Sequence, residues 1–425
     1  MTAAWISLMI SASAAMSLPP PDDLTSRWFM TLSRVLDGGP PVYDAGFVLA
    51  DAVPRHERRF TEFSGDVSGR FIEALAVTES RLGQRFPILS EVASRIPALQ
   101  KPAGFFGDEF PDGPIRPRPH MALLWGNGRL LIGLAEYARL RGDESALACA
   151  RRLADFIVAI APRLNNDEVM KEFSGDQHAV GYICWTQIIE GLVAMYEATR
   201  DERYLQVARE MGRRVFVHEG QHSHGLLTAA RGLARLAAVT GEAEWLTRAT
   251  GLWHRVVATG NLLPHGCVPE AFRPMVLRDE GCSEADWVRL SLALWQATGD
   301  VTYLNAAEHA WFNEFSMNQF STGDFGHRTI SPEGMGGVVM RAPKGGATNQ
   351  SFSAVSIAHG CARAWWCCTL HGLRAFPDVA AAVFRSEGDA LYYDLPLNGQ
   401  AVASGLVVRA CSTLQRDASC RLEIV

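Results

Sequence analysis

The chain has 425 residues, of which 48% are hydrophobic and 20% charged, and its formal net charge at pH 7 is -6. This composition is that of a globular enzyme and excludes a disordered or fibrous chain, and the acidic balance gives no electrostatic reason to expect nucleic acid as a partner. No apolar run reaches the roughly 20 residues that a membrane-spanning helix needs.

The first 22 residues are mostly apolar and contain a run of prolines. Ala12-Ser13-Ala14 is typical of a signal-peptide cleavage site, whereas Met1-Thr2 lacks the positive side chain that such peptides carry. We therefore leave open whether residues 1–22 are a signal peptide, a tail or a buried first helix, and whether the protein is cytoplasmic or exported.

Residues 23–118 combine amphipathic stretches with turns rich in glycine and proline. A helix that ends before Pro97 is expected, because the residue before a proline disfavours helical geometry. The loop at 101–118 is too long for a plain connector and is typical of a binding element. The helices predicted here are Leu24–Leu36, Arg70–Arg81 and Ile88–Ile96.

From Met121 onward, a unit of two amphipathic helices recurs four times. Apolar residues return at i, i+3, i+4 and i+7 in both helices of each unit. An acidic residue follows each turn, where it can cap the second helix, and three times it directly follows glycine. The units span residues 121–158, 184–216, 226–257 and 285–312, and the acidic residues are Asp143, Asp201, Glu242 and Asp300.

Repeated helix pairs of this kind form either an open solenoid or a closed toroid. The first helix of each unit is rich in Trp, Gly, Gln and small residues, and the second is rich in Arg and Glu. This asymmetry favours a mainly α fold, a closed (α/α)6 barrel over residues 23–385 whose inner helices line a central cavity. We expect the N-terminal helices to supply the two remaining pairs, with the solenoid as the alternative.

The pattern changes after about residue 315. Gly-rich segments precede a helix predicted over Ala354–Phe376. Alternating apolar and polar residues then predict strands at Ala390–Leu397, Ala401–Cys411 and Leu422–Val425. We interpret residues 386–425 as the beginning of an incomplete β-domain of the sandwich type.

The nine cysteines are an odd number and do not indicate a disulfide framework in a chain of this length. Four residues instead form a donor set, Glu280 and Cys282 in one motif and the adjacent Cys367 and Cys368 in another. One carboxylate and three thiols complete a tetrahedral shell for Zn2+, which would keep the thiols deprotonated. The alternative is that these cysteines are small buried hydrophobic residues.

The Glu-x-Cys and Cys-Cys motifs, the preceding Glu270-Ala271-Phe272, the helical hairpins and the loop at 100–107 resemble the β-L-arabinofuranosidase family of glycoside hydrolases. The resemblance runs from about Gly104 to the C-terminus and is strongest over Pro269–Gln319 and Cys361–Phe376. It implies an (α/α)6 barrel followed by β-domains, a zinc ion and a cysteine nucleophile.

The resemblance also implies roles for single residues. Cys367 matches the nucleophile, which also contacts the metal, and Glu270 matches the general acid/base. Glu280, Cys282 and Cys368 match the other zinc ligands. These roles agree with retaining hydrolysis, in which one group attacks the anomeric carbon and another protonates the leaving oxygen. Burial in an apolar loop would raise the pKa of Glu270 toward that of an acid, although Glu270 taken alone would be interpreted as an exposed loop residue.

Sugar contacts are expected from the inner helices. The resemblance matches His222 to a sugar-contacting histidine; without it, His222 and His224 would be interpreted as capping residues. Arg129 and Trp185 stand where the family has further histidines, and His371 stands where it has asparagine, which leaves the identity of the sugar open. The candidate substrate-binding residues are His222, His224, Arg129, Trp185, Gln187 and His371.

The sequence therefore predicts a zinc-dependent retaining glycosidase that acts on arabinose-containing or related glycans. One alternative is another (α/α)6 sugar enzyme, such as an epimerase, an unsaturated-uronyl hydrolase or a lyase, which would not need the cysteine cluster. Another is a non-catalytic glycan-binding protein with structural zinc. No nucleic-acid partner is expected, and a homodimer is left open.

Overall fold

The computed structural model describes residues 24–39, 42–52, 62–174, 178–272, 278–328, 362–403, 405–413 and 419–424. The predictions for residues 1–22 and for the glycine-rich stretch between 329 and 361 lie outside these ranges. Within the described ranges, none of the helices combines the length and apolarity that crossing a bilayer requires.

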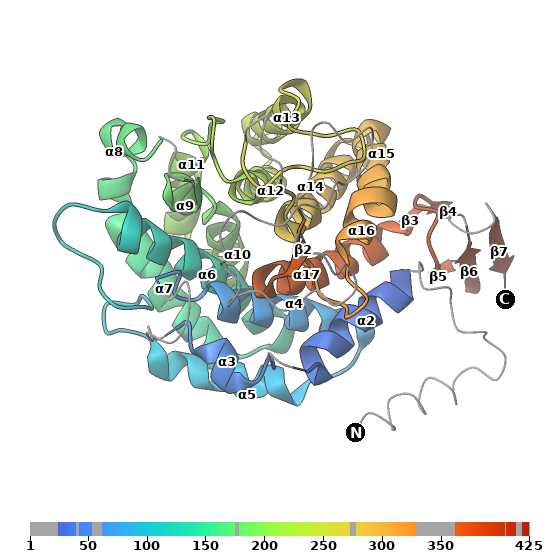
Figure 1. The fold of residues 1–425 in the computed structure, drawn as a ribbon, viewed down its shortest axis with the longest axis horizontal. Helices are drawn as coiled ribbons and strands as arrows, with labels where there is room; N and C mark the ends of the chain where they lie inside the picture. Colours follow the sequence, from blue (N-terminus) through green and yellow to red (C-terminus); the bar gives the residue numbers. More distant parts are fainter. Residues whose placement is uncertain are drawn as a thin grey trace.

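Within the described ranges, six helices form a closed inner ring (Figure 1). Most residues of these helices are buried, as expected for helices that have neighbours on all sides. The ring confirms the (α/α)6 barrel and excludes the open solenoid. Its members contact one another in the order α4 (Asp66–Leu82), α6 (Ala122–Arg141), α10 (Ile189–Thr199), α12 (Ser223–Thr240), α14 (Gly281–Thr298) and α17 (Trp366–Ala382), which returns to α4.

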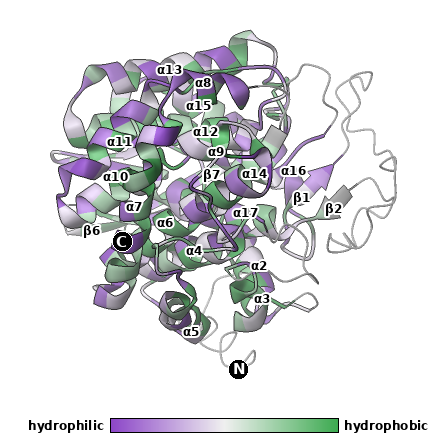
Figure 2. Cartoon of the chain, turned by 90° about the vertical axis from the view of Figure 1, so that its left-hand side faces the viewer, coloured by the Kyte–Doolittle hydropathy of each residue, from purple (hydrophilic) through white to green (hydrophobic). Residues whose placement is uncertain are grey.

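An outer helix covers each member of the ring. Outer helices such as those over 202–212 and 243–258 carry hydrophilic residues beside hydrophobic ones (Figure 2), because one face packs on the ring and the other meets water. The pairs are α5 (Pro87–Arg95) on α4, α7 (Glu144–Leu164) on α6, α11 (Glu202–Gly212) on α10, α13 (Ala243–Ala258) on α12, α15 (Val301–Ala310) on α14 and α2 (Leu24–Asp37) on α17.

The sixth pair differs from the prediction. The N-terminal residues supply one complete pair, α4 with α5, but α2 packs on α17, a helix from the other end of the barrel sequence. The first and last barrel helices therefore close the ring together. Their partnership is a long-range contact that the local periodicity of either helix could not report.

The turns inside the four repeats share one conformation. Each inner helix is followed by a residue with positive φ, and glycine suits this position because a Cβ makes left-handed geometry cost roughly 1–2 kcal/mol. Three of these residues are glycines, and Arg200 takes the fourth position. The φ values are +66° at Gly142, +60° at Arg200, +72° at Gly241 and +71° at Gly299.

The next residue caps the outer helix, as predicted, in three of the four repeats. The carboxylates of Asp143, Asp201 and Asp300 each accept a backbone N–H of the first turn. Glu242 occupies the same position, but its longer side chain accepts hydrogen bonds from Arg209 and from Trp245 Nε1 instead.

Several helix boundaries differ from the predicted ones. The α4 helix begins at Asp66, four residues before the predicted start at Arg70. The α5 helix ends at Arg95, and the chain continues through Pro97 as a short 3-10 turn. The helix predicted over 354–376 begins at Trp366, after a strand that pairs antiparallel with residues 326–328. The remaining elements of this part are α3 (Ala45–Leu49), η1 (Ile96–Leu99), η2 (Pro117–Met121), α8 (Asp167–Glu172), η3 (His178–Val180), α9 (Ile183–Thr186), η4 (Trp311–Phe315), α16 (Ser316–Asn318), β1 (Gly326–Arg328) and β2 (Ala362–Ala364).

Small antiparallel sheets follow the barrel and lie to one side of it (Figure 1). The strand predicted over 401–411 is a hairpin instead, because Gly405 at φ +77° permits a turn within it. The division of the chain at residue 386 and its β-domain stay predictions. The strands are β3 (Phe384–Glu387), β4 (Ala390–Tyr393), β5 (Gly399–Ala403), β6 (Leu406–Ser412) and β7 (Cys420–Ile424).

Candidate active site and metal centre

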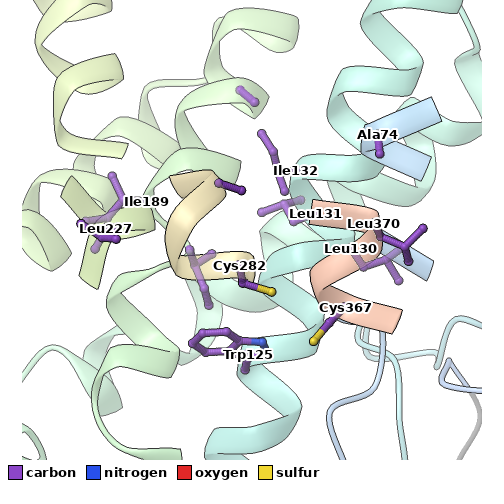
Figure 3. Packing of buried hydrophobic residues seen from close by; sticks show 14 of the residues in the cluster. Ala74, Trp125, Leu130, Leu131, Ile132, Ile189, Leu227, Cys282, Cys367 and Leu370 are labelled. Carbon is purple, nitrogen blue, oxygen red and sulfur yellow. The ribbon is translucent and has the colours of Figure 1, made fainter. Parts of the chain in front are cut away.

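The predicted metal ligands are brought together by two inner helices. Glu280 caps α14 and Cys282 lies in its first turn, whereas Cys367 and Cys368 lie in the first turn of α17. The four ligand atoms lie within 4.8 Å of one another, and the sulfurs of Cys282 and Cys368 are 3.7 Å apart. Figure 3 shows Cys282 and Cys367 approaching from different helices beside Trp125.

Gly281 permits this close approach of α14 and α17. A Cβ at position 281 would lie 3.0 Å from the Cβ of Cys368 and 2.9 Å from Oδ1 of Asn318. Such contacts leave no room for a side chain in a packed interior. The glycine between Glu280 and Cys282 is therefore a requirement of the cluster.

The cluster contains more potential anions than cations. Arg70 Nη1 donates to Cys282 Sγ at 3.4 Å. Burial raises the pKa of Cys282, Cys368 and Glu280 well above their usual ranges. Burial acts in the same direction on Cys367, but hydrogen bonds from the other two cysteines and the charge of Arg70 outweigh it and lower its pKa to about 6. Of the three thiols, the one of Cys367 therefore loses its proton most readily.

A cavity of about 270 Å³ lies beside the cluster. Cys367 and Glu280 line it, whereas Cys282 and Cys368 lie behind its wall. Cys367 is 8% exposed and the other two cysteines 0%, so Cys367 is the thiol that a ligand in the cavity would meet. The lining residues are Phe63, Asp66, Arg70, Arg118, Trp125, Ala179, His222, His224, Glu270, Arg278, Glu280, His327, Trp365, Trp366 and Cys367.

Glu270 lines the same cavity and is 6% exposed, so it is not an exposed loop residue. Its backbone is fixed by a hydrogen bond from its N–H to the Arg278 carbonyl at 3.0 Å. Its carboxylate forms an ion pair with the Arg278 side chain, and His327 Nδ1 lies 3.9 Å away. The carboxylate thus faces the cavity between two basic side chains.

His222 lies between Glu270 and the cysteine cluster. Its Nε2 is 3.4 Å from Glu280 Oε2, and one ligand atom each of His222, Glu270 and Glu280 falls within a 4.8 Å group. Burial lowers the pKa of His222 to about 4, so the ring is neutral at neutral pH. A neutral imidazole at a cavity wall can hydrogen-bond a sugar hydroxyl.

His224 also lines the cavity, but its ring nitrogens face a buried polar network. Its Nε2 lies 2.9 Å from Arg70 Nη2 and 3.0 Å from Arg129 Nη2. Because arginine can only donate, Nε2 accepts, and the proton sits on Nδ1, which lies 2.5 Å from Asp286 Oδ2. Burial lowers the pKa of His224 well below its usual value, in agreement with a neutral ring.

Asp286 is the centre of this network. Arg231 donates to it, His371 Nε2 lies 2.8 Å from its Oδ1, and Thr228 Oγ1 donates to its Oδ2 at 2.8 Å. Burial would raise the pKa of Asp286, but Arg231 and the two histidines outweigh burial and hold it well below the usual range. Asp286 therefore stays ionised behind the cavity wall.

Four sequence candidates do not line the cavity. Arg129 and His371 belong to the Asp286 network. Trp185 Nε1 donates to Asn165 Oδ1 at 2.7 Å, and Gln187 Nε2 donates to the Trp125 carbonyl at 3.2 Å. All four are at most 2% exposed. They lie behind the wall of this cavity, where they support residues that line it, and their expected contact with a ligand stays a prediction.

Arg70, Asp286 and His327 were not predicted from the sequence. Arg70 and His327 line the cavity, and Asp286 supports it. A signal for Arg70 exists in the sequence, because Asp66 precedes it by four residues on the same helix, and the structure pairs the two at 2.7 Å. No comparable signal precedes His327, which is placed by a short strand.

The donor set of the cysteine cluster fits a divalent metal ion. Two thiolates bound at about 2.3 Å to one tetrahedral ion lie about 3.8 Å apart, close to the 3.7 Å between Cys282 and Cys368. A dication would also balance the negative charge that Arg70 alone cannot compensate. Glu280, Cys282, Cys367 and Cys368 can therefore hold a metal ion.

Comparison with known proteins agrees with these motifs. The family model described as the catalytic domain of GH127 β-L-arabinofuranosidase matches residues 48–381. None of the curated proteins matches the sequence.

Solved structures show the same fold. A GH127 β-L-arabinofuranosidase from Geobacillus stearothermophilus T6 matches with a TM-score of 0.64 at 17% identity, over 96% of this chain and 72% of that chain. A second GH127 β-arabinofuranosidase matches with a TM-score of 0.64 at 18% identity, over 94% and 65%. A cellobiose 2-epimerase from Bacillus thermoamylovorans matches with a TM-score of 0.51 at 12% identity, over 74% and 87%. The chain thus spans between 65% and 72% of the length of the two GH127 enzymes.

Proposed function

This chain belongs to the GH127 β-L-arabinofuranosidase family of glycoside hydrolases, and from that premise we propose that it is a zinc-dependent retaining glycosidase. Its substrate is a glycan with a terminal β-L-arabinofuranosyl unit or a closely related sugar. Cys367 is the nucleophile, Glu270 is the general acid/base, and Glu280, Cys282, Cys367 and Cys368 are the zinc ligands.

One observation carries the proposal. Of the three clustered cysteines, Cys367 alone lines the cavity, and its pKa is lowered while the pKa values of Cys282 and Cys368 are raised. The reactive thiolate and the carboxylate of Glu270 therefore meet the same space. A nucleophile and an acid/base on one small cavity are the two groups that retaining hydrolysis needs.

In the first step, the Cys367 thiolate attacks the anomeric carbon. A carbon–sulfur bond forms as the carbon–oxygen bond to the leaving group breaks, and the Glu270 carboxylic acid gives its proton to the leaving oxygen. The product is a sugar bound to Cys367 and a Glu270 carboxylate, which Arg278 and His327 are placed to stabilise.

In the second step, water replaces the leaving group. The Glu270 carboxylate takes a proton from the water as its oxygen attacks the anomeric carbon, and the carbon–sulfur bond breaks to restore the Cys367 thiolate. Two inversions at one carbon give net retention. Zinc, when bound, keeps the cluster thiols deprotonated and makes Cys367 a better leaving group in this step.

The size of the cavity supports a terminal sugar as substrate. About 270 Å³ lies just below the usual range for ligand sites, which suits a single sugar unit better than a long chain. His222 presents a neutral ring to this space, and Trp125 lies beside it with the two ring centroids 5.3 Å apart. His222 can give a polar contact to a hydroxyl, and Trp125 provides an aromatic surface.

The test is Cys367→Ala, assayed on an aryl β-L-arabinofuranoside with zinc content measured on the same sample. We expect turnover to fall by at least about 10³-fold, because no other group on the cavity replaces the nucleophile, while zinc held by three remaining ligands is largely kept. Cys420→Ala is the matched control, since Cys420 is exposed on β7, and it should keep full turnover.

Glu270→Gln tests the second role. We expect slow turnover that added azide restores, because azide can attack the anomeric carbon without a general base. Glu219→Gln, a change at an exposed glutamate, should leave activity intact. Zinc binding by the parent chain without turnover of any arabinofuranoside would favour the non-catalytic glycan-binding alternative. Turnover that survives Cys367→Ala would favour another (α/α)6 sugar chemistry.

A further inference from the structure

A second cluster of metal-ligand side chains lies near the start of α14 and shares no residue with the first. It combines His265 and Cys267 from the loop after α13 with Glu314 from η4. One ligand atom from each lies within 4.8 Å of the others. His265 Nε2 and Glu314 Oε2 are 3.2 Å apart.

The contacts inside this cluster are poorly aligned. His265 Nε2 and Glu314 Oε2 face each other without a well-aligned hydrogen bond. Glu284 hydrogen-bonds Cys267 through its carboxyl group, and its Oε1 accepts the Val268 N–H at 3.2 Å. A buried polar atom without a well-aligned partner costs about 1–3 kcal/mol, and one ion between His265 Nε2 and Glu314 Oε2 would satisfy both atoms.

The surroundings of the cluster are rich in carboxyl groups. Asp279, Glu284 and Glu314 are all fully buried there. In the part of the chain that the structure describes, Arg328 is the arginine paired with them, through Asp279 Oδ2 at 2.5 Å and through Glu314 Oε1. Burial raises the pKa of Glu284 well above its usual range and that of Asp279 to about 7, and a bound divalent cation would stabilise the ionised form of these carboxyl groups.

We infer that His265, Cys267 and Glu314 bind a second divalent metal ion. The inference does not rest on the proposed glycosidase activity. A tetrahedral ion bonded at about 2.0 Å to nitrogen and oxygen separates these atoms by about 3.3 Å, which is close to the separation of His265 Nε2 and Glu314 Oε2.

The chemistry of the donors selects zinc. One imidazole, one thiolate and carboxylate oxygens suit Zn2+, whereas Mg2+ and Ca2+ take oxygen ligands. The His265 side chain is 29% exposed although its Nε2 is buried, so the ring stands between solvent and the site. An ion can therefore enter past this side chain.

The site would fix the loop that carries the acid/base. Cys267 precedes Glu270 by three residues, and its carbonyl accepts the Leu263 N–H at 2.9 Å, which closes a turn around His265. Glu314 belongs to η4. A metal ion shared by the loop and η4 would tie the loop to the barrel wall.

Zinc stoichiometry tests the inference. The full chain, dialysed against metal-free buffer after loading with Zn2+, should hold two zinc ions per chain by mass spectrometry. Cys282→Ser/Cys368→Ser, which leaves the first site two ligands, and His265→Gln, which leaves the second site two, should each hold about one ion, and the combined variant should hold none. His309→Gln is the matched control, because His309 is an exposed histidine next to the same loop, and it should keep both ions.

A second readout guards against a variant that fails to fold. In the Cys282→Ser/Cys368→Ser background, bound Co2+ should show a thiolate charge-transfer absorption that Cys267→Ser removes. A parent chain that holds one zinc ion, lost in Cys282→Ser/Cys368→Ser and kept in His265→Gln, would overturn the inference. So would two ions that both survive His265→Gln and Cys267→Ser.

Discussion

Two buried clusters in the barrel look alike by geometry and differ in charge. His224, Asp286 and His371 bring three ligand atoms within 4.8 Å of one another, as do the four residues of the cysteine cluster. Around Asp286, however, Arg231 binds the carboxylate directly, Arg289 lies 3.6 Å from it, and Arg70 and Arg129 contact His224. The cysteine cluster has Arg70 beside Cys282.

The difference shows that converging ligand atoms do not by themselves identify a metal site. Arginines already occupy the acceptor atoms of the Asp286 cluster, and a dication would be repelled there. The cysteine cluster has the opposite balance, because one guanidinium cannot compensate up to four anions. We therefore interpret the first as a permanent scaffold for the cavity wall and the second as a site completed by metal.

Of the changes that distinguish the two clusters, metal removal should have the largest effect on turnover and stability. Dialysis against a chelator should abolish turnover and lower the unfolding temperature, and zinc should restore both. At zinc concentrations about 1,000-fold above the dissociation constant, binding adds about 4 kcal/mol to the unfolding free energy. Scanning fluorimetry with and without zinc measures this shift. Cys282→Ser/Cys368→Ser, which leaves two of the four ligands, should lose most of the zinc response. A parent chain whose unfolding temperature does not change with the chelator would contradict the proposed centre.

Asp286→Asn should damage the other cluster without removing the metal. The amide has nearly the same shape, but Arg231 loses the negative partner that offsets its burial. Breaking a buried pair in this way costs about 3–5 kcal/mol, which urea unfolding at neutral pH would measure. The variant should still bind zinc at Glu280 and the cysteines. Loss of that zinc on Asp286→Asn would mean that the two clusters are one site.

The sequence predicted the cysteine cluster better than the Asp286 cluster for a physical reason. The cysteine cluster comes from two short motifs, and its residue types are those that bind zinc. Its residues are Glu280, Cys282, Cys367 and Cys368. Asp286 lies in no recognisable motif, and its role depends on contacts with Arg231 and other residues that are distant in sequence. Local pattern carries no information about such contacts.

The fold likewise has features that the sequence predicts and features that it does not. The four repeats could be predicted because their periodicity, turns and caps are local, as at Asp143 and Asp300. The pairing of α2 with α17 and the position of His371 behind the cavity wall are long-range features. Both features follow from closure of the helical ring. The set of repeats implies this closure, but no single segment of the sequence specifies it.

Acid should weaken the arginine-rich cluster at a defined pH. Burial would raise the pKa of Glu190, but its ion pair with Arg231 lowers the pKa to about 2. A lowered folded-state pKa stabilises the protein above the ordinary carboxyl pKa, and this contribution disappears as the pH falls from about 4.5 to about 2. The shift corresponds to ~3 kcal/mol.

Urea unfolding of the parent chain and Glu190→Gln at several pH values tests this pH dependence. The two unfolding free energies should differ by ~3 kcal/mol at pH 6 and converge toward pH 3. Glu144→Gln is the control, because Glu144 is exposed in the first turn of α7, and its curve should run parallel to that of the parent. A difference that stays constant from pH 6 to pH 3 would assign the stabilisation to packing.

Arg129→Met should have the smallest effect and is the sharpest test of the charge argument. Arg129 contacts His224 and Thr228, yet both keep a partner without it, since Arg70 still donates to His224 Nε2 and Thr228 still donates to Asp286. Methionine retains much of the packing, so the unfolding free energy should change by less than about 1 kcal/mol. Arg231→Met removes the arginine that pairs with both Glu190 and Asp286. It should lower the unfolding free energy by at least about 3 kcal/mol in the same measurement. Equal losses in the two variants would show that the number of arginines, and not their pairing, stabilises this cluster.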